Sequence, residues 1–281
     1  TALTDGSDYD LRAVTTDLAG NPTTSTTVTV TVDNTAPNTT ITANPADPTN
    51  ATGATFSFTS TEAGGTFECR IDGGAWSACS SPKTYSGLAD GSHTFDVRAT
   101  DPAGNQDATA ASFTWTVDTT APNTTITASP ADPTNATGAS FSFTSTEGGS
   151  TFEVRLDGGA WSASASPKAY TGLADGSHTF DVRATDDAGN LDASAASYTW
   201  TVDTTNPTGS ITAPAASARV RAIVAVTSDS ADTGGSGVGS VSVQRSAAGA
   251  GSWTTVGSDS FAPYSVDLYT TPLTDSSDYD L

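Results

Sequence analysis

The sequence has 281 residues, of which only 15% are charged and 35% are hydrophobic, and its 31 acidic residues against 10 basic ones give a net charge of −21. Such an excess of negative charge disfavours binding to nucleic acid or to an anionic membrane surface and makes cations the natural partners. The chain has no apolar run long enough for membrane insertion, no signal-like start and no initiating Met, so we expect it to be part of a longer protein.

Internal repeats define the expected organisation of the chain. Residues 36–120 reappear at an offset of 85 as residues 121–205, and both copies contain DPTNATGA, FSFTSTE, DGGAWSA and GLADGSHTFDVRATD. A third module opens with TTNPTGSITAP, but its interior has a different sequence. The repeats favour several small modules over one large core.

A second, longer period links the two ends of the chain. Residues 1–11 match residues 271–281 in nine of eleven positions, which is a spacing of 270. This match indicates a super-repeat of three modules. The predicted segments are therefore the C-terminal part of a variant module (1–35), two full modules (36–120 and 121–205) and the N-terminal part of the variant module (206–281).

Each module is expected to be all-β. In chain order, TFSFTST, GTFECRID, TFDVRATD and SFTWTVD alternate apolar and polar residues, and clusters of Gly, Pro, Asp and Asn separate them. About seven strands fit into one module, and no segment has a sustained helical period. Two sheets would then enclose a core built from Phe56, Phe58, Phe95, Val97, Phe113, Trp115 and Val117, with Trp76 and Trp161 covering the hairpin side.

The two cysteines of the chain, Cys69 and Cys79, flank the segment RIDGGAWSA. Its GG turn would place them opposite each other on a β-hairpin, which predicts a disulfide and an oxidising, extracytoplasmic compartment. The alternative is a pair of small buried thiols.

The two histidines indicate structure rather than catalysis. His93 and His178 lie one period apart, and the variant module has Tyr9 at the same place, where a β-sandwich often has a corner tyrosine whose polar tip bonds back to the chain. No combination of nucleophile, histidine and acid stands out from the repeats, and no glycine-rich phosphate loop precedes a helix. We therefore predict that the chain is not an enzyme.

A family resemblance rests on three recurring elements: the VDTTAP linker, the DxAGN turn before the last strand and the DGxxxF/Y strand entry. Together they resemble the bacterial Ig-like tandem repeat domains of large extracellular surface and adhesin-type proteins, over essentially the whole chain. The resemblance implies immunoglobulin-like β-sandwich modules that form an elongated rod, and an extracellular or cell-surface location.

The same topology predicts a place for metal ions. In an immunoglobulin-like sandwich, the loop after the second strand and the loop before the last strand share the pole where the chain enters, so oxygen ligands gather at each junction. Related adhesins are known for calcium ions that stiffen their linkers, and calcium prefers six to eight oxygen ligands. The alternative is that Asp and Asn simply form tight turns. The candidate ligands are Asp33, Glu62, Asp101 and Asn105; Asp118, Glu147, Asp186 and Asn190; and Asp203 with Asp229 and Asp232.

The expected function is that of a structural repeat segment of a long extracellular bacterial fibre, filament or adhesin stalk, with adjacent repeats or further copies as partners. The variant module would be completed by a covalent neighbour or by strands donated from another copy. The eleven-residue overlap is redundant in a strand-exchanged polymer and so favours the covalent joint. The alternative function is binding of glycans or proteins, for which the non-repeated aromatic residues are Trp253, Phe261, Tyr264 and Tyr269.

Overall fold

The computed structural model describes residues 3–220, 222–233, 235–269 and 279–280. All regular elements in this part of the chain are β-strands, so the all-β prediction is confirmed. None of the described residues forms a helix long and apolar enough to span a membrane. The chain divides into two compact units, residues 1–122 with 185–191, and residues 123–184 with 192–281.

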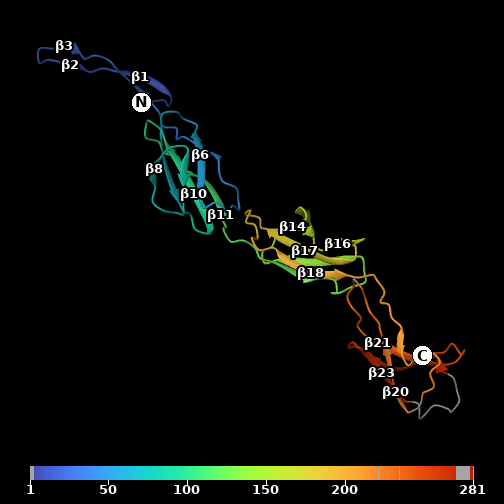
Figure 1. Ribbon diagram of the computed structural model, residues 1–281. Coiled ribbons are helices and arrows are strands. Elements are labelled where there is room, and N and C mark those ends of the chain that lie inside the picture. Colours follow the sequence, from blue (N-terminus) through green and yellow to red (C-terminus); the bar gives the residue numbers. More distant parts are fainter. Residues whose placement is uncertain (1–2, 221, 234, 270–278, 281) are drawn as a thin grey trace. The chain divides into compact units, whose positions relative to one another are not determined.

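Residues 36–120 form a two-layered β-sandwich (Figure 1). One layer is a three-stranded sheet in the order β5-β6-β9, and the other is a four-stranded sheet in the order β11-β10-β7-β8. All neighbouring strands are antiparallel. The strands are β5 (Thr39–Ala43), β6 (Ala54–Ser60), β7 (Thr66–Ile71), β8 (Ser77–Cys79), β9 (Lys83–Tyr85), β10 (Gly91–Thr100) and β11 (Ala111–Val117).

Aromatic side chains fill the space between the two layers, as the alternating sequence pattern predicts. The rings of Phe56 and Phe95 stack at 4.1 Å between centroids, and Trp115 lies 5.1 Å from Phe56. Burying a side chain of this size stabilises the fold by roughly 1.5–3 kcal/mol. The fully or almost fully buried core consists of Ala54, Phe56, Phe58, Cys69, Phe95, Val97, Trp115 and Val117.

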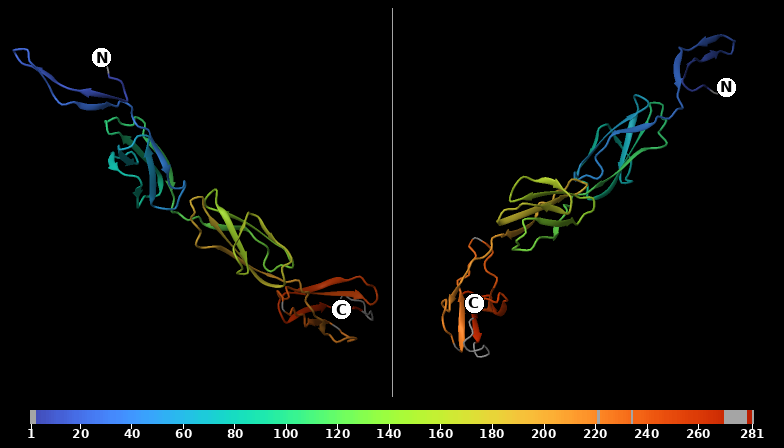
Figure 2. Two further views of the ribbon diagram at one scale, coloured as in Figure 1. Left: turned by 90° about the horizontal axis from the view of Figure 1, so that it is seen from above. Right: turned by 90° about the vertical axis from the view of Figure 1, so that its right-hand side faces the viewer.

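The second repeat has the same seven strands, each displaced by 85 residues. Figure 2 draws this repeat in colours from green to orange. Its sheets have the orders β12-β13-β16 and β15-β14-β17-β18. The equal displacement follows from near-identical sequences folding locally in the same way. The strands are β12 (Thr124–Ala128), β13 (Ala139–Ser145), β14 (Thr151–Leu156), β15 (Ser162–Ser164), β16 (Lys168–Tyr170), β17 (Gly176–Thr185) and β18 (Ala196–Val202).

The described part of residues 206–281 also has two sheets, with the orders β19-β20-β23 and β22-β21-β24. Its buried core is smaller and consists of Val226, Val243, Val266 and Leu268. The strands are β19 (Ile211–Ala213), β20 (Ile223–Ser228), β21 (Val241–Ala247), β22 (Thr254–Asp259), β23 (Tyr264–Tyr269) and β24 (Tyr279–Asp280).

The N-terminal segment forms a two-stranded ribbon (blue in Figure 1). β1 (Ser7–Leu11) pairs with β4 (Val28–Val32), and β2 (Val14–Thr16) pairs with β3 (Pro22–Thr24). Almost all of its strand residues are exposed, because no second sheet in the described part of the chain covers either face.

A disulfide joins Cys69 to Cys79, with their Cα atoms 5.8 Å apart, so the predicted bridge between β7 and β8 is confirmed. Trp76, just after the GG turn, lies between the guanidinium groups of Arg70 and Arg98, at 4.5 and 4.2 Å from its ring centroid. These contacts fix the hairpin against the outer face of the four-stranded sheet.

Candidate metal centre at the module entrance

The turn that precedes the last strand is built by its own side chains. The carboxylate of Asp101 accepts hydrogen bonds from the N–H groups of Gly104 and Asn105 at 2.7 and 2.8 Å, and the Asp101 N–H donates to the Asn105 carbonyl at 3.0 Å. Gly104 has a φ of 98°, a conformation that favours glycine. The sequence DPAGN therefore folds as a closed turn without any other group.

The same turn holds the segment that enters the module. The side-chain amide of Asn105 donates to Asp101 Oδ2 at 2.8 Å and to the backbone carbonyl of Asp33 at 3.0 Å. Both hydrogens of this amide are thereby used, so Oδ1 is the one atom of the Asn105 side chain that remains suitable for binding a cation. This residue connects the linker to the turn.

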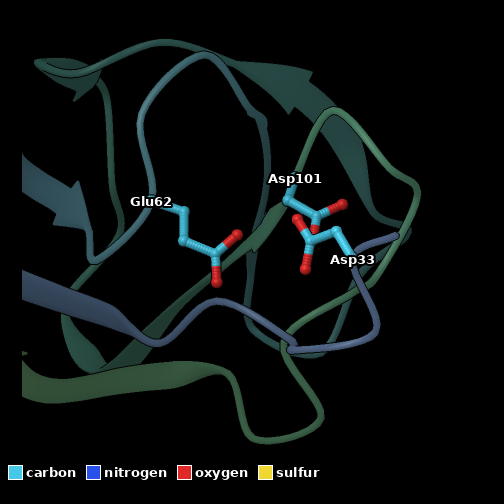
Figure 3. Close-up of side chains that lie close together, drawn as sticks. All are labelled: Asp33, Glu62 and Asp101. Atoms are coloured by element: carbon cyan, nitrogen blue, oxygen red, sulfur yellow. The ribbon is translucent and has the colours of Figure 1, made fainter. Parts of the chain in front are cut away.

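Three carboxylates meet at this end of the module. Asp33 comes from the entering linker, Glu62 follows β6, and Asp101 begins the turn after β10; one oxygen from each lies within 4.8 Å of the others. Figure 3 shows the Glu62 side chain pointing toward the other two carboxylates. Asp101 is buried and the other two residues are half-buried. The structure thus brings together the three acidic residues that the sequence proposed for this junction.

Glu62 and Asp101 differ in how readily they ionise. Burial raises the pKa of Glu62, and the negative charges of Asp33 and Asp101 raise it further. Burial also opposes ionisation of Asp101, but the hydrogen bonds from Asn105 and from the backbone of the turn outweigh it and lower the pKa of Asp101. Glu62 is therefore the carboxylate whose ionisation is least favourable in the absence of a positive charge.

This donor set suits a hard divalent cation. Three carboxylates supply up to six oxygens, and calcium binds six to eight oxygens from carboxylates, carbonyls and water. The turn hydrogen bonds occupy three of about four lone-pair positions on the Asp101 carboxylate, so this group is able to close the turn and still offer Oδ2 to an ion. A cation would also relieve the repulsion that raises the pKa of Glu62.

The second repeat carries the equivalent carboxylates, Asp118, Glu147 and Asp186. Asp186 accepts the N–H of Asn190 at 2.7 Å, and the Asn190 amide donates to Asp186 Oδ2 at 2.8 Å and to the Asp118 carbonyl at 2.7 Å. The N–H of Glu147 donates to Ser145 Oγ at 3.2 Å, as the N–H of Glu62 does to Ser60. The connection between linker and turn is thus repeated with the module.

The variant module arranges its acidic residues differently. Asp203 accepts a hydrogen bond from the N–H of Ser236 at 2.5 Å, and its carboxylate also contacts the Asp232 side chain. Asp229 instead accepts the N–H of Ser210 at 2.6 Å. The structure therefore places Asp232 beside Asp203 and uses Asp229 to close the start of β19.

Three further acidic residues contact the linkers but were not among the candidate ligands proposed from the sequence. They are the aspartates of the DGS or DGSH strand entry, and each accepts hydrogen bonds from a linker threonine, such as Thr119 Oγ1 to Asp90 at 2.7 Å. The repeat period was the signal that could have found them. The pairs are Asp5 with Thr35, Asp90 with Thr119 and Asp175 with Thr204.

Two facing antiparallel sheets of three and four strands, repeated in tandem, define the class of Ig-like β-sandwich modules. Residues 120–204 match the family model of the bacterial Ig-like domain. That part of the chain, which coincides with the second repeat, is therefore a bacterial Ig-like domain, and the resemblance indicated by the linker and turn motifs is confirmed there.

The chain is also similar to several solved structures. Fibronectin(III)-like modules of CbhA from Clostridium thermocellum align with 16% identity over 58% of this chain and 93% of theirs, with a TM-score of 0.37. A 1.5-MDa bacterial ice-binding adhesin aligns with 18% identity over 84% and 88% of the two chains, with a TM-score of 0.34. A tetra-tandem repeat from the extending region of a large adhesion protein aligns with 20% identity over 95% and 73%, with a TM-score of 0.28. No curated protein matches the chain.

Proposed function

We propose that this chain is a structural segment of a long extracellular bacterial adhesin or fibre, in which Ig-like modules supply length and calcium at the module entrances supplies stiffness. The supporting observation is the recurrence, at the same offset of 85 residues, of an Asn amide that donates to the linker carbonyl, at 3.0 Å from Asn105 to Asp33 and at 2.7 Å from Asn190 to Asp118. A contact that recurs at each linker favours a mechanical role, because the behaviour of a tandem array depends on the contacts between neighbouring repeats.

Calcium fits this role because of where the carboxylates lie. In the first repeat, Asp33 belongs to the linker, whereas Glu62 and Asp101 belong to loops of the module that follows. An ion bound by all three would join the linker to two loops at once and so limit rotation at the junction. The proline after each linker, such as Pro37, already restricts the backbone there.

The test is thermal unfolding and small-angle X-ray scattering of the chain in calcium and in excess chelator. We expect calcium to raise the melting temperature and to increase the maximum dimension of the particle. The matched variants are E62Q/E147Q, which remove one carboxylate from each candidate site, and D47N/D132N, which remove two carboxylates elsewhere in the repeats. Equal responses of the two variants, or no response of the wild type, would refute the role of calcium.

A second candidate function rests on exposed aromatic side chains in the variant module. Trp253, Phe261 and Tyr269 are 52%, 79% and 56% exposed, whereas Tyr264 is buried. Exposed aromatic rings bind the apolar faces of sugars and are enriched at protein interfaces. A glycan array probed with the chain and with the variant W253A/F261A tests this function, and signals that both proteins share would argue against it.

A further inference from the structure

The two sheets of each complete module end in four edge strands. An edge strand offers unpaired N–H and C=O groups to any other strand that approaches it. In residues 36–120 the edges are β5 and β9 of one sheet and β8 and β11 of the other. Mispairing between copies is a particular risk for this chain, because FSFTST occurs both at residues 56–61 and at residues 141–146. The features that protect each edge therefore bear on how copies of the chain associate.

Three of these edges are protected by their backbone geometry. The register of β5 shifts between Ile41 and Ala43, and a bulge of this kind twists an edge away from regular pairing. β8 has only three residues. The last part of β11 is covered by the segment between β5 and β6. There, the N–H of Thr116 donates to Asp47 Oδ1 at 2.9 Å, and the N–H of Thr49 donates to the Thr116 carbonyl at 3.0 Å.

The fourth edge, β9, carries a charged side chain on the side that faces the core. Lys83 lies directly opposite Phe56 in the antiparallel pair, and the side chains of such a pair project to the same face. Phe56 is fully buried, so Lys83 also leaves its strand on the core side, and it is half-buried. Its Nζ atom lies 5.2 Å from the centroid of the Tyr85 ring, which packs against the core. The ammonium group is thus held over an aromatic ring at the rim of the sandwich.

The second repeat protects its edges in the same way. Lys168 lies opposite Phe141, and its Nζ atom is 5.3 Å from the centroid of the Tyr170 ring. The other edges have a register shift in β12, a β15 of three residues, and a hydrogen bond of 2.9 Å from the Thr134 N–H to the Thr201 carbonyl beside β18. The sequence contains two lysines, and both lie at this one position of an edge strand.

An ammonium group at this position opposes pairing along β9 and β16. A strand added beside β9 would extend the sheet and cover the rim where the Lys83 ammonium lies, so this group would lose part of its water. Removing a charge from water is unfavourable unless an opposite charge pairs with it. Inward-pointing charged residues on edge strands are a known means of preventing edge-to-edge aggregation.

We propose that the complete modules resist edge-to-edge pairing with other copies of the chain, and that Lys83 and Lys168 protect the edges β9 and β16. This inference rests on the proposed structural role and specifies it: the modules work as a single, unbundled stalk rather than as a laterally assembled fibre. Both lysines lie outside the candidate metal centres, so the inference holds or fails independently of calcium.

Sedimentation velocity of residues 1–281 in excess chelator, in salt that screens the charge of −21, tests this proposal. The variant K83V/K168V removes the inward charges, and we expect it to associate at a concentration about tenfold below that of wild type. R12Q/R219Q is the matched control, because it also removes two positive charges but from exposed positions outside both complete modules. The same onset of association in K83V/K168V and wild type, or an equal effect of R12Q/R219Q, would refute the protective role.

Two further measurements distinguish protection of an edge from a contribution to folding. K83R/K168R keeps an inward cation and should associate no more readily than wild type. Hydrogen exchange of associated K83V/K168V should show new protection at residues 83–85 and 168–170. Association of K83R/K168R as strong as that of K83V/K168V would overturn the proposal. So would association that comes with a lower melting temperature and without this protection, because the lysines would then only stabilise the fold.

Discussion

His93 lies between two hydrogen-bond acceptors: its Nδ1 atom is 2.8 Å from Oδ2 of Asp72, and its Nε2 atom is 2.8 Å from the carbonyl oxygen of Ala89. A neutral imidazole donates through only one nitrogen, so both contacts are hydrogen bonds only when the ring is protonated. The carbonyl of Ala89 and the carboxylate of Asp72 accordingly raise the pKa of His93, and His178 has the same surroundings in the second repeat.

Module stability should therefore fall as the pH rises above neutrality. A histidine whose pKa is raised on folding contributes stability that is complete below its unfolded pKa, near 6.5, and is lost as the pH passes the folded pKa. Asp72, the carboxylate that contacts the ring, does not titrate in this range because its pKa is lowered. Melting temperatures from pH 5.5 to 9 measure the effect.

The control for this prediction is the variant H93Q/H178Q, whose melting temperature should vary less over the same range of pH. The sequence contains two histidines, so a proton-detected titration of the wild type resolves both rings. Midpoints at or below 6.5 for these rings would contradict the proposed geometry.

The substitution Glu62→Gln should raise the melting temperature of metal-free chain at neutral pH. The raised pKa of Glu62 means that its ionised form disfavours the folded state, and that this cost is present above the folded pKa and disappears as the pH falls through it. Glutamine removes the charge that Asp33 and Asp101 repel. Calorimetry of E62Q and wild type in chelator, at pH 7 and again near pH 4, measures the difference, which should vanish at the lower pH.

The matched control is Glu68→Gln. Glu68 accepts hydrogen bonds from Arg98 at 3.0 and 2.8 Å, so its charge is paired and its removal should not stabilise the module. In calcium the order of the melting temperatures of E62Q and wild type should reverse, because calcium should raise the melting temperature of E62Q by less than that of wild type. An increase in melting temperature for E68Q as large as that for E62Q would mean that net charge, rather than the local cluster, is responsible.

The strands and the core of the repeats were predictable because they depend on the alternation of apolar and polar residues along short segments of the sequence. Phe56 and Phe58 are separated by one polar residue in a segment bounded by turn residues, and both are buried where the pattern places them. The cluster of Asp33, Glu62 and Asp101 was also accessible, since fold topology alone determines which loops share a pole.

Other features depend on conformations that a sequence does not reveal. Asp72 reaches His93 from the DGG turn, where it adopts a φ of 52°, and the pattern of residues does not specify that conformation. In the variant module, the choice between Asp229 and Asp232 as the neighbour of Asp203 depends on the course of a loop that has no repeated copy for comparison.

The disulfide should account for a measurable difference between the two repeats. Cys69 and Cys79 correspond to Val154 and Ser164 in the second repeat, so the variant C69V/C79S gives the first repeat the residues of the second. Loss of a bridge that closes a loop of this length should cost about 2–3 kcal/mol. Urea unfolding of both forms measures the loss. The reciprocal variant V154C/S164C should gain stability, and no change in either would show that the bridge adds none.

Phe56→Ala should destabilise its own module and leave the next one unaffected. Phe56 has no exposed surface and stacks on Phe95 at 4.1 Å, so its truncation leaves a cavity that should cost about 3–5 kcal/mol. Phe141 makes the same contact with Phe180 in the second repeat, and F141A is therefore the matched variant.

Because each module has its own core, calorimetry of F56A should show one transition moved to lower temperature and another that remains in place. The transition that moves in F56A should be the one that stays in place in F141A. The disulfide shows which module this transition belongs to, because reduction should lower the melting temperature only of the module that contains Cys69. If both transitions move together in either variant, the modules unfold as one cooperative body, and stability is shared between neighbouring modules rather than local to each.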